Sequence, residues 1–343
     1  MKLRKFANIE DVRQHNSFKQ FKRWRQERMK KLKLKDYSYT VPNVEPDLNY
    51  LHNNRKQPSI TWVGHSTFLI QMAGLNIITD PVWSKKMAFQ KRLADPGLPI
   101  DDVPPIDVVL ISHSHYDHLN IQSLRRLKGQ KQLIVPAGLS GKLKLKGFAN
   151  VRELAWWESV QIDGVKFTFV PSQHWTRRNP WDMNSSHWGG WMIEPATEAA
   201  LTAEAGQQST SVLANTLSSP STGSRPVVSD APTVYFAGDS GYFHGFKEIG
   251  LNFKIDVALM PIGAYEPEWF MGPQHVTPEE AMQAFEDTGA KYFVPMHYGA
   301  FKLADDTPRE ALDRLENARA VNGVDSDRIV VLPHGETWRL SGK

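Results

Sequence analysis

The sequence from residue 107 to residue 118 reads DVVLISHSHYDH, and this stretch decides the fold. Residues 107–111 are rich in Val, Leu and Ile, as in a buried β-strand. His113, His115, Asp117 and His118 follow directly. Side chains at the C-terminal end of a strand in an α/β fold point into a crevice. Three histidines and an aspartate buried there without a cation would lack hydrogen-bond partners. The pattern therefore predicts a metal site at the end of this strand.

The composition restricts the chemistry of that site. The chain has 343 residues, 41% of them hydrophobic, and no cysteine. This excludes disulfides, thiolate metal ligands and a cysteine nucleophile, so that His and carboxylate side chains must hold any metal. We find no apolar run of about 18 residues and no apolar signal segment. We therefore expect a cytoplasmic protein that can bind peripherally to a membrane.

The basic residues are concentrated at the N-terminus. Residues 1–35 contain 13 Lys and Arg against three acidic residues, whereas the whole chain has a net charge of only +4. An apolar stripe within this arm predicts a basic amphipathic helix and comprises Phe18, Phe21, Trp24, Met29 and Leu32. Two interpretations of this helix are open: it contacts a membrane surface, or it packs on the domain with a solvated basic face. No candidate ligand lies in residues 1–35, so we expect their removal to spare the metal site.

Short strand-like runs separated by turn residues cover much of the remaining chain. They lie at 60–63, 67–71, 76–79, 132–135, 159–163, 166–171, 189–194, 233–237, 256–260, 292–295 and 329–332. Asn120 predicts the start of a short helix, and Thr277 and Thr307 each open a capping box with Pro at the first helical position. We expect a mixed α/β domain over 59–343, preceded by an arm and connector over 1–58. A Ser-, Ala- and Pro-rich segment, 196–233, predicts a mobile insertion in a hairpin.

The HxHxDH pattern resembles the signature of the metallo-β-lactamase superfamily. The resemblance implies an αββα sandwich of two mixed sheets flanked by helices. It also implies one metal ion on His113, His115 and His174, and a second on Asp117, His118 and His297. Asp239 would bridge the two ions, and Asp80 would support the ligands from behind. Such His and carboxylate sites suit two Zn²⁺ ions best, with Fe or Mn as alternatives.

Further motifs resemble the N-acylphosphatidylethanolamine-hydrolysing phospholipase D family. They include ITWVGHS at 60–66, PSQHW at 171–175, AYEPEWFM at 264–271 and HYG at 297–299, within a resemblance that covers 59–340 apart from the insertion. The resemblance implies a phosphodiesterase that releases phosphatidic acid and an N-acylethanolamine. A lactonase or other hydrolase of a small metabolite, and a nuclease, are the alternatives. Nucleic acid is the less favoured partner, because apolar residues alternate with the basic ones in the arm.

Several side chains near the predicted ligands are candidates for supporting roles. His275 is our candidate proton donor to the leaving group, alongside the catalytic carboxylates Asp117 and Asp239. His65 also lies in a family-like motif; it is the second candidate for this proton donor and is expected beside the metal ligands without binding a metal itself. For substrate binding we select four residues in the loops around the site, namely Arg177, Arg178, Tyr265 and Trp269.

Overall fold

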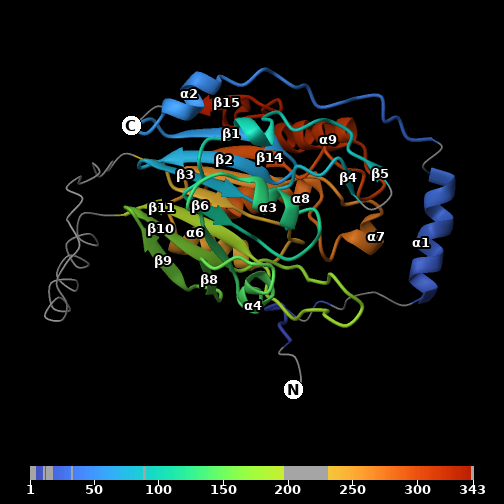
Figure 1. Ribbon diagram of the computed structural model, residues 1–343. Coiled ribbons are helices and arrows are strands. Elements are labelled where there is room, and N and C mark those ends of the chain that lie inside the picture. Colours follow the sequence, from blue (N-terminus) through green and yellow to red (C-terminus); the bar gives the residue numbers. More distant parts are fainter. Residues whose placement is uncertain are drawn as a thin grey trace, which may run out of the picture.

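The protein is described by a computed structural model over residues 5–10, 12, 18–31, 34–87, 90–196 and 231–340. Its centre consists of two mixed β-sheets with helices outside them (Figure 1). This is the αββα sandwich that we predicted.

The first sheet has seven strands in the order β15-β1-β2-β3-β6-β7-β8. Pairing is antiparallel from β15 to β3 and parallel from β3 to β8. The strands are β1 (Ser59–Gly64), β2 (Thr67–Met72), β3 (Leu75–Thr79), β6 (Val108–Leu110), β7 (Gln132–Pro136), β8 (Val151–Leu154) and β15 (Thr337–Arg339).

The second sheet has six strands in the order β14-β13-β12-β11-β10-β9. Here β12, β13 and β14 run parallel, and β9 to β12 pair in antiparallel fashion. The strands are β9 (Ser159–Ile162), β10 (Val165–Val170), β11 (Gly190–Pro195), β12 (Val234–Phe236), β13 (Val257–Pro261) and β14 (Tyr292–Met296). A separate small ribbon pairs β4 (Lys86–Met87) with β5 (Gln90–Lys91).

Helices lie outside the two sheets, and the first of them stands to one side of both (Figure 1). They are α1 (Phe18–Lys31), α2 (Leu48–Asn53), α3 (Ile121–Arg126), α4 (Ser140–Lys144), α6 (Gly245–Asn252), α7 (Glu268–Met271), α8 (Pro278–Thr288) and α9 (Pro308–Val321), with 3₁₀ turns η1 (Ile100–Asp102) and η2 (Ser326–Arg328). Both predicted capping boxes are present, on α8 and α9. Asn120 caps α3 by accepting a hydrogen bond from the Ser123 N–H. None of the helices in the described ranges is long and apolar enough to cross a bilayer.

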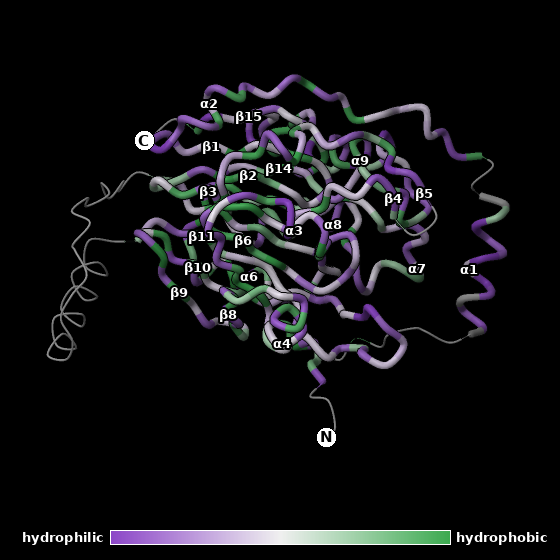
Figure 2. The backbone as a smooth tube through the Cα atoms, viewed as in Figure 1, coloured by the Kyte–Doolittle hydropathy of each residue, from purple (hydrophilic) through white to green (hydrophobic). Residues whose placement is uncertain are grey.

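Strand β6 shows why the decisive stretch is so apolar. Val108 and Leu110 point into the core between the two sheets, whereas Val109 and Ile111 point into a second core beneath the outer helices. Successive side chains of a strand alternate in direction, so a strand covered on both faces is apolar throughout. Figure 2 shows hydrophobic residues concentrated in the central strands and a largely hydrophilic α1.

One predicted strand is wrong. Residues 329–332 form only an isolated bridge, between Ile329 and Phe293. The strand lies instead at β15, where Thr337 and Arg339 pair with β1. Pro333 follows the apolar run and has no N–H to donate to a ladder, so it ends any pairing before a strand can form. Strand β8 escaped prediction because two consecutive charged residues, Arg152 and Glu153, interrupt its apolar pattern, which its position at the edge of the sheet allows.

The arm is helical, as predicted, but part of it packs against the domain. Trp24 of α1 stacks on Phe270 of α7, with ring centroids 5.7 Å apart. Arg28 forms a salt bridge of 3.2 Å to Asp305. Lys19, Lys22 and Arg25 of the same helix are exposed. The helix therefore packs on the domain and presents a basic face outward; the predicted stripe residue at position 32 and the side chains at 18 and 21 lie outside the described residues.

Residues 197–230 of the predicted insertion also lie outside the described residues. The segments on either side belong to neighbouring strands, since Ile193 of β11 pairs with Val234 of β12 in antiparallel register. The insertion thus connects two adjacent antiparallel strands, as the sequence indicated.

Candidate metal centre

Three ring nitrogens converge beyond the ends of β6 and β10. The His115 Nδ1 atom lies 2.9 Å from His113 Nε2 and 3.2 Å from His174 Nε2. The other ring nitrogen of His113 donates to the Ser112 hydroxyl (2.9 Å), and that of His174 donates to the Gln274 carbonyl (2.9 Å). Both Nε2 atoms therefore present lone pairs, and a single proton on His115 cannot satisfy them both. A cation among the three nitrogens would.

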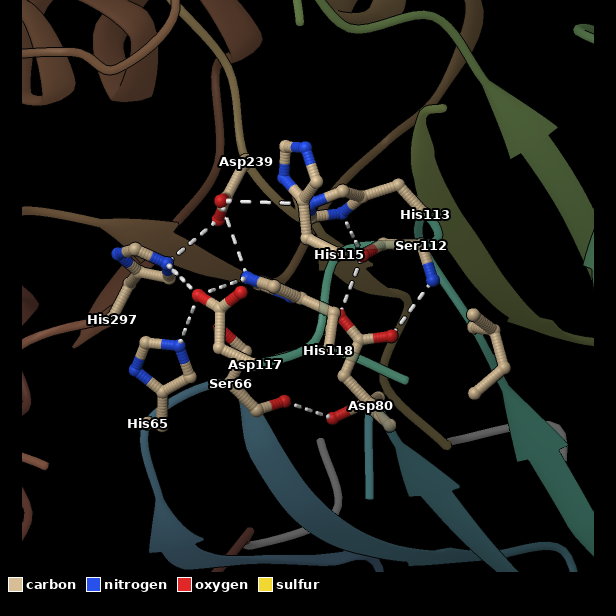
Figure 3. Close-up of polar contacts among 12 residues, drawn as sticks. His65, Ser66, Asp80, Ser112, His113, His115, Asp117, His118, Asp239 and His297 are labelled. Carbon is tan, nitrogen blue, oxygen red and sulfur yellow. Dashed lines mark hydrogen bonds and ion pairs between the residues drawn. The ribbon is translucent and has the colours of Figure 1, made fainter. Parts of the chain in front are cut away.

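A second group of donors lies beside the first. The Asp117 Oδ2 atom is 3.4 Å from His118 Nε2 and 3.6 Å from His297 Nε2. Asp239 lies between the two groups: its carboxylate is 3.2 Å from His118 and from His297, and 3.8 Å from His113 (Figure 3). The structure thus brings together all seven predicted ligands in the predicted partition.

Asp80 holds the ligands from behind, in the position expected of it. One carboxylate oxygen accepts the Ser112 N–H (2.7 Å), and the other accepts the Ser112 hydroxyl (2.5 Å) and the His118 Nδ1–H (2.7 Å). This fixes the tautomer of His118 directly and that of His113 through Ser112, which leaves the Nε2 atoms free for a metal. We did not select Ser112 from the sequence, although it adjoins the motif.

The electrostatics of the site demand positive charge. Burial alone would raise the pKa values of Asp117 and Asp239, but the neighbouring histidines hold both well below the usual range. Burial alone would likewise lower the pKa of His297, yet the carboxylates raise it to about 9, and they raise that of His118 well above its usual value. Within the part of the chain that the structure describes, no hydrogen-bond partner is found for the buried Nε2 atoms of His118 and His297 or for the Asp239 Oδ1 atom. This donor set therefore fits two divalent cations.

Two further histidines border the centre. His65 is buried, and its Nε2 atom lies 3.2 Å from Asp117 Oδ2. Burial is the main cause that lowers its pKa to about 3, so the neutral ring donates to Asp117 and orients it. The Nδ1 atom of His275 lies 3.9 Å from Asp239 Oδ2 and has no hydrogen-bond partner among the described residues. His65 thus supports a ligand, whereas His275 lines the open cavity.

The cavity over the centre has two lobes, which meet at His115, Asp117 and Trp175. One lobe, the apolar lobe, is lined by Phe270, Met271 and Leu303, and also reaches Asp239 and His275. The other, the basic lobe, is lined by Lys86, Tyr116, Asn120, Arg177 and Arg178. A substrate at the metals therefore faces an apolar surface on one side and cationic side chains on the other.

The predicted substrate contacts need correction. Tyr265 is fully buried beneath Arg314 and does not line the cavity. Trp269 faces the arm, where its indole N–H donates to Glu27 (3.0 Å) and Arg23 lies over its ring. Within the short helix α7, Trp269 points toward the arm, whereas the next two side chains, Phe270 and Met271, line the cavity.

The two predicted arginines differ in their surroundings. Arg178 stacks on Tyr116 and donates from one guanidinium nitrogen to the carbonyls of Ser114, His115 and Leu119. It therefore holds the ligand loop while it borders the basic lobe. Arg177 is exposed beside Trp175 and is the better placed of the two for a substrate anion.

Comparison with known proteins identifies the family. A model described as a beta-lactamase superfamily domain matches residues 75–205 and 201–298. A Caenorhabditis elegans protein named N-acyl-phosphatidylethanolamine-hydrolyzing phospholipase D 1 is 30% identical over 306 residues, which cover 82% of this chain and 76% of that protein. A Methanopyrus kandleri protein named a metal-dependent hydrolase is 28% identical, and the match covers 81% of this chain and 98% of that protein.

Solved structures agree on the fold. The structure of a metallo hydrolase from Ignicoccus hospitalis superimposes with a TM-score of 0.58 at 22% identity, and the match covers 84% of this chain and all of the other. This superposition supports the fold, and the family match and the site geometry support metal-dependent hydrolysis. The chain belongs to the beta-lactamase superfamily and is a metal-dependent hydrolase with the metallo-β-lactamase fold.

Proposed function

We propose that the protein is a zinc-dependent phosphodiesterase of the phospholipase D type, acting on N-acylphosphatidylethanolamine-like phospholipids. The observation that carries this proposal is the joining of the apolar and basic lobes at the candidate metal centre. A phospholipid has the same division, with an anionic phosphodiester between apolar chains and a polar headgroup. The similarity to the Caenorhabditis elegans phospholipase D supports this substrate class.

Seven side chains would hold the metal pair: His113, His115, His174, Asp117, His118, His297 and the bridging Asp239. Two such ions would supply Lewis-acid stabilisation of the phosphate and an activated water. Asp80 and His65 keep the ligands oriented. Burial is the main cause that lowers the pKa of His275 to about 4, so this ring is neutral near pH 7 and offers one N–H to the phosphate or leaving oxygen.

The basic lobe accounts for the recognition of the phosphodiester. Arg177 and Lys86 are exposed cations on its wall, within the cavity that reaches Asp117. A guanidinium pairs with phosphate oxygens in a bidentate geometry, so Arg177 is our main candidate for this contact. The apolar lobe, at Met271 and Leu303, would take an acyl chain.

The arm would bring the site to the lipid. Lys19, Lys22 and Arg25 are exposed on α1, and 66% of Met29 is accessible to solvent. Each basic residue near an anionic surface contributes on the order of 1 kcal/mol to binding. Because α1 packs on α7, a membrane touching this face would lie next to the apolar lobe. We propose a peripheral contact through α1.

A product assay tests the proposed reaction. Metal-loaded protein is incubated with N-acylphosphatidylethanolamine vesicles, an acyl lactone or single-stranded RNA, and the products are identified by mass spectrometry. We expect phosphatidic acid and N-acylethanolamine from the first substrate alone. Turnover of only the lactone or the RNA would replace our proposal with the corresponding alternative.

Two matched variants test the role of the apolar lobe. Met271→Glu places a charge on its wall, and we expect it to reduce phospholipid turnover more than turnover of a short water-soluble phosphodiester. Leu251→Glu introduces the same change at an 89% exposed leucine on α6 and should leave both activities unchanged. Equal losses on both substrates in Met271→Glu would count against acyl-chain binding in this lobe.

A further inference from the structure

The residues before α1 contact the loops that carry two predicted ligands. We refer to residues 5–10, with the sequence KFANIE, as the N-terminal strap. The Asn8 Oδ1 atom accepts the backbone N–H of His174 (3.0 Å) and the indole N–H of Trp188 (2.8 Å). One side-chain oxygen therefore ties a predicted ligand to the tryptophan at the other end of the same loop.

The strap is anchored on both sides of Asn8. The Phe6 N–H donates to the Asn184 carbonyl (2.9 Å), and the Phe6 ring lies 4.5 Å from the ring of His187. The Glu10 carboxylate accepts the backbone N–H (2.9 Å) and a ring nitrogen (3.0 Å) of His244, which follows Asp239 by five residues. The strap thus connects the His174 loop with the segment that leaves Asp239.

The contact of Asn8 with His174 concerns a buried group. His174 and Trp188 are almost inaccessible to solvent. Among the described residues, Asn8 is the partner that we find for the His174 backbone N–H, whereas the Trp188 indole also reaches the Ser172 carbonyl (3.1 Å). Loss of Asn8 would leave a buried N–H without an acceptor, so the loop would move to find one. The His174 ring, whose Nδ1 atom is held by Gln274, would then leave the position in which it can bind a metal.

We propose that the N-terminal strap is part of the metal centre and that Asn8 is a positioning residue for His174. The strap precedes the region matched by the family model, which begins at residue 75. The proposal rests on the metal centre and not on the phospholipid substrate. It remains open to test if the protein hydrolyses some other molecule.

Asn8→Ala and Asn8→Asp test this role against each other. The alanine removes the acceptor, whereas the aspartate retains oxygens that accept both hydrogen bonds. Removal of a partner that orients a ligand typically weakens metal binding by about 10- to 100-fold. We expect this loss in Asn8→Ala and near wild-type affinity in Asn8→Asp. The matched control is Asn53→Ala, which removes a side chain whose hydrogen bonds in the described ranges all go to Asn49 within α2.

Zinc affinity is measured by competition with a chromophoric chelator on the full chain, so the readout does not depend on substrate turnover. The absorption spectrum of the cobalt-loaded protein reports ligand geometry, and we expect it to change in Asn8→Ala and to recover in Asn8→Asp. Wild-type affinity and spectrum in Asn8→Ala would overturn the proposal, as would equal losses in both variants. If Asn8→Ala does not fold, Glu10→Ala decides the outcome: weaker zinc binding supports the role of the strap, and unchanged binding refutes it.

Discussion

Removing the metals should convert the centre into a pair of protonated histidines. In the metal-free protein, Asp117 and Asp239 offset the effect of burial and raise the pKa of His297 to about 9 and that of His118 well above its usual value. Near neutral pH each of these rings then holds an extra proton. Burial lowers the pKa values of His113 and His174 well below normal, so these two rings are already neutral.

Metal ions bind the unprotonated rings, so loading must displace the extra protons. We expect the release of about two protons per chain near neutral pH, with metal affinity falling as the pH falls. The same shift affects stability. The pKa of His297 is raised from 6.5 to about 9. The contribution of this shift to the free energy of unfolding of the metal-free protein is therefore complete below pH 6.5 and disappears as the pH rises through 9. The magnitude is roughly 3 kcal/mol.

Calorimetric titration with zinc in buffers of different ionisation enthalpy measures the number of released protons. Urea unfolding of the metal-free protein between pH 6 and pH 9 measures the loss of stability. Asp239→Asn removes the main carboxylate beside His118 and His297, so it should reduce both effects. Zinc binding without proton release at neutral pH, or metal-free stability that rises over this range, would refute the assignment of these two rings.

The remaining predictions concern single parts of the site. Asp239→Asn should abolish activity and lower the metal content from two ions per chain, whereas Asp80→Asn should lower metal affinity by about 10- to 100-fold. Metal analysis separates the two effects, and full metal occupancy in Asp239→Asn would contradict a bridging role for Asp239. His275→Ala removes an N–H donor to the reacting phosphate and should reduce kcat by about 10²- to 10³-fold with unchanged metal content, and loss of metal instead would make His275 a ligand. Replacing residues 197–230 with a short glycine-containing turn should leave metal content intact, and a metal-free product would show that the segment is structural.

The features that the sequence predicts well are local. The apolar run of β6 is covered on both faces, and its strand character follows from that burial. The capping boxes at Thr277 and Thr307 are reciprocal hydrogen bonds within four residues, so sequence spacing determines them. One short loop carries four of the predicted ligands, His113, His115, Asp117 and His118. The chain offers few partners other than a metal ion for so many polar side chains in one place. His174, Asp239 and His297 were found through the family resemblance, because each is isolated in the sequence.

The features that the sequence does not predict depend on contacts between distant segments. Trp269 and Phe270 are neighbouring aromatic residues, and only the turn of α7 determines which of them lines the cavity. Asn8 carries no periodic or motif signal, and its partner His174 lies 166 residues away. In the same way, Arg178 holds the ligand loop through backbone carbonyls, which no pattern of side chains reveals.

The structure changes how the arm must be tested. We expected removal of residues 1–35 to spare the metal site, but that deletion also removes the strap and Asn8. Charge reversal at Lys19, Lys22 and Arg25 is the better perturbation, because these side chains are exposed, whereas Trp24 and Arg28 make the contacts with the domain. We expect weaker binding to anionic vesicles and lower vesicle activity in the triple variant. The difference from wild type should shrink as salt screens the attraction.

Activity on a water-soluble phosphodiester separates a membrane contact from damage to the site. The strap and the docking side of α1 remain intact in the triple variant, so soluble turnover and metal content should match the wild type. Parallel losses on both substrates would mean that α1 acts through α7 on the cavity wall instead of through a membrane. Unchanged vesicle activity would leave the basic face without a role in reaching the lipid, while the packing of Trp24 on Phe270 would remain the reason for the helix.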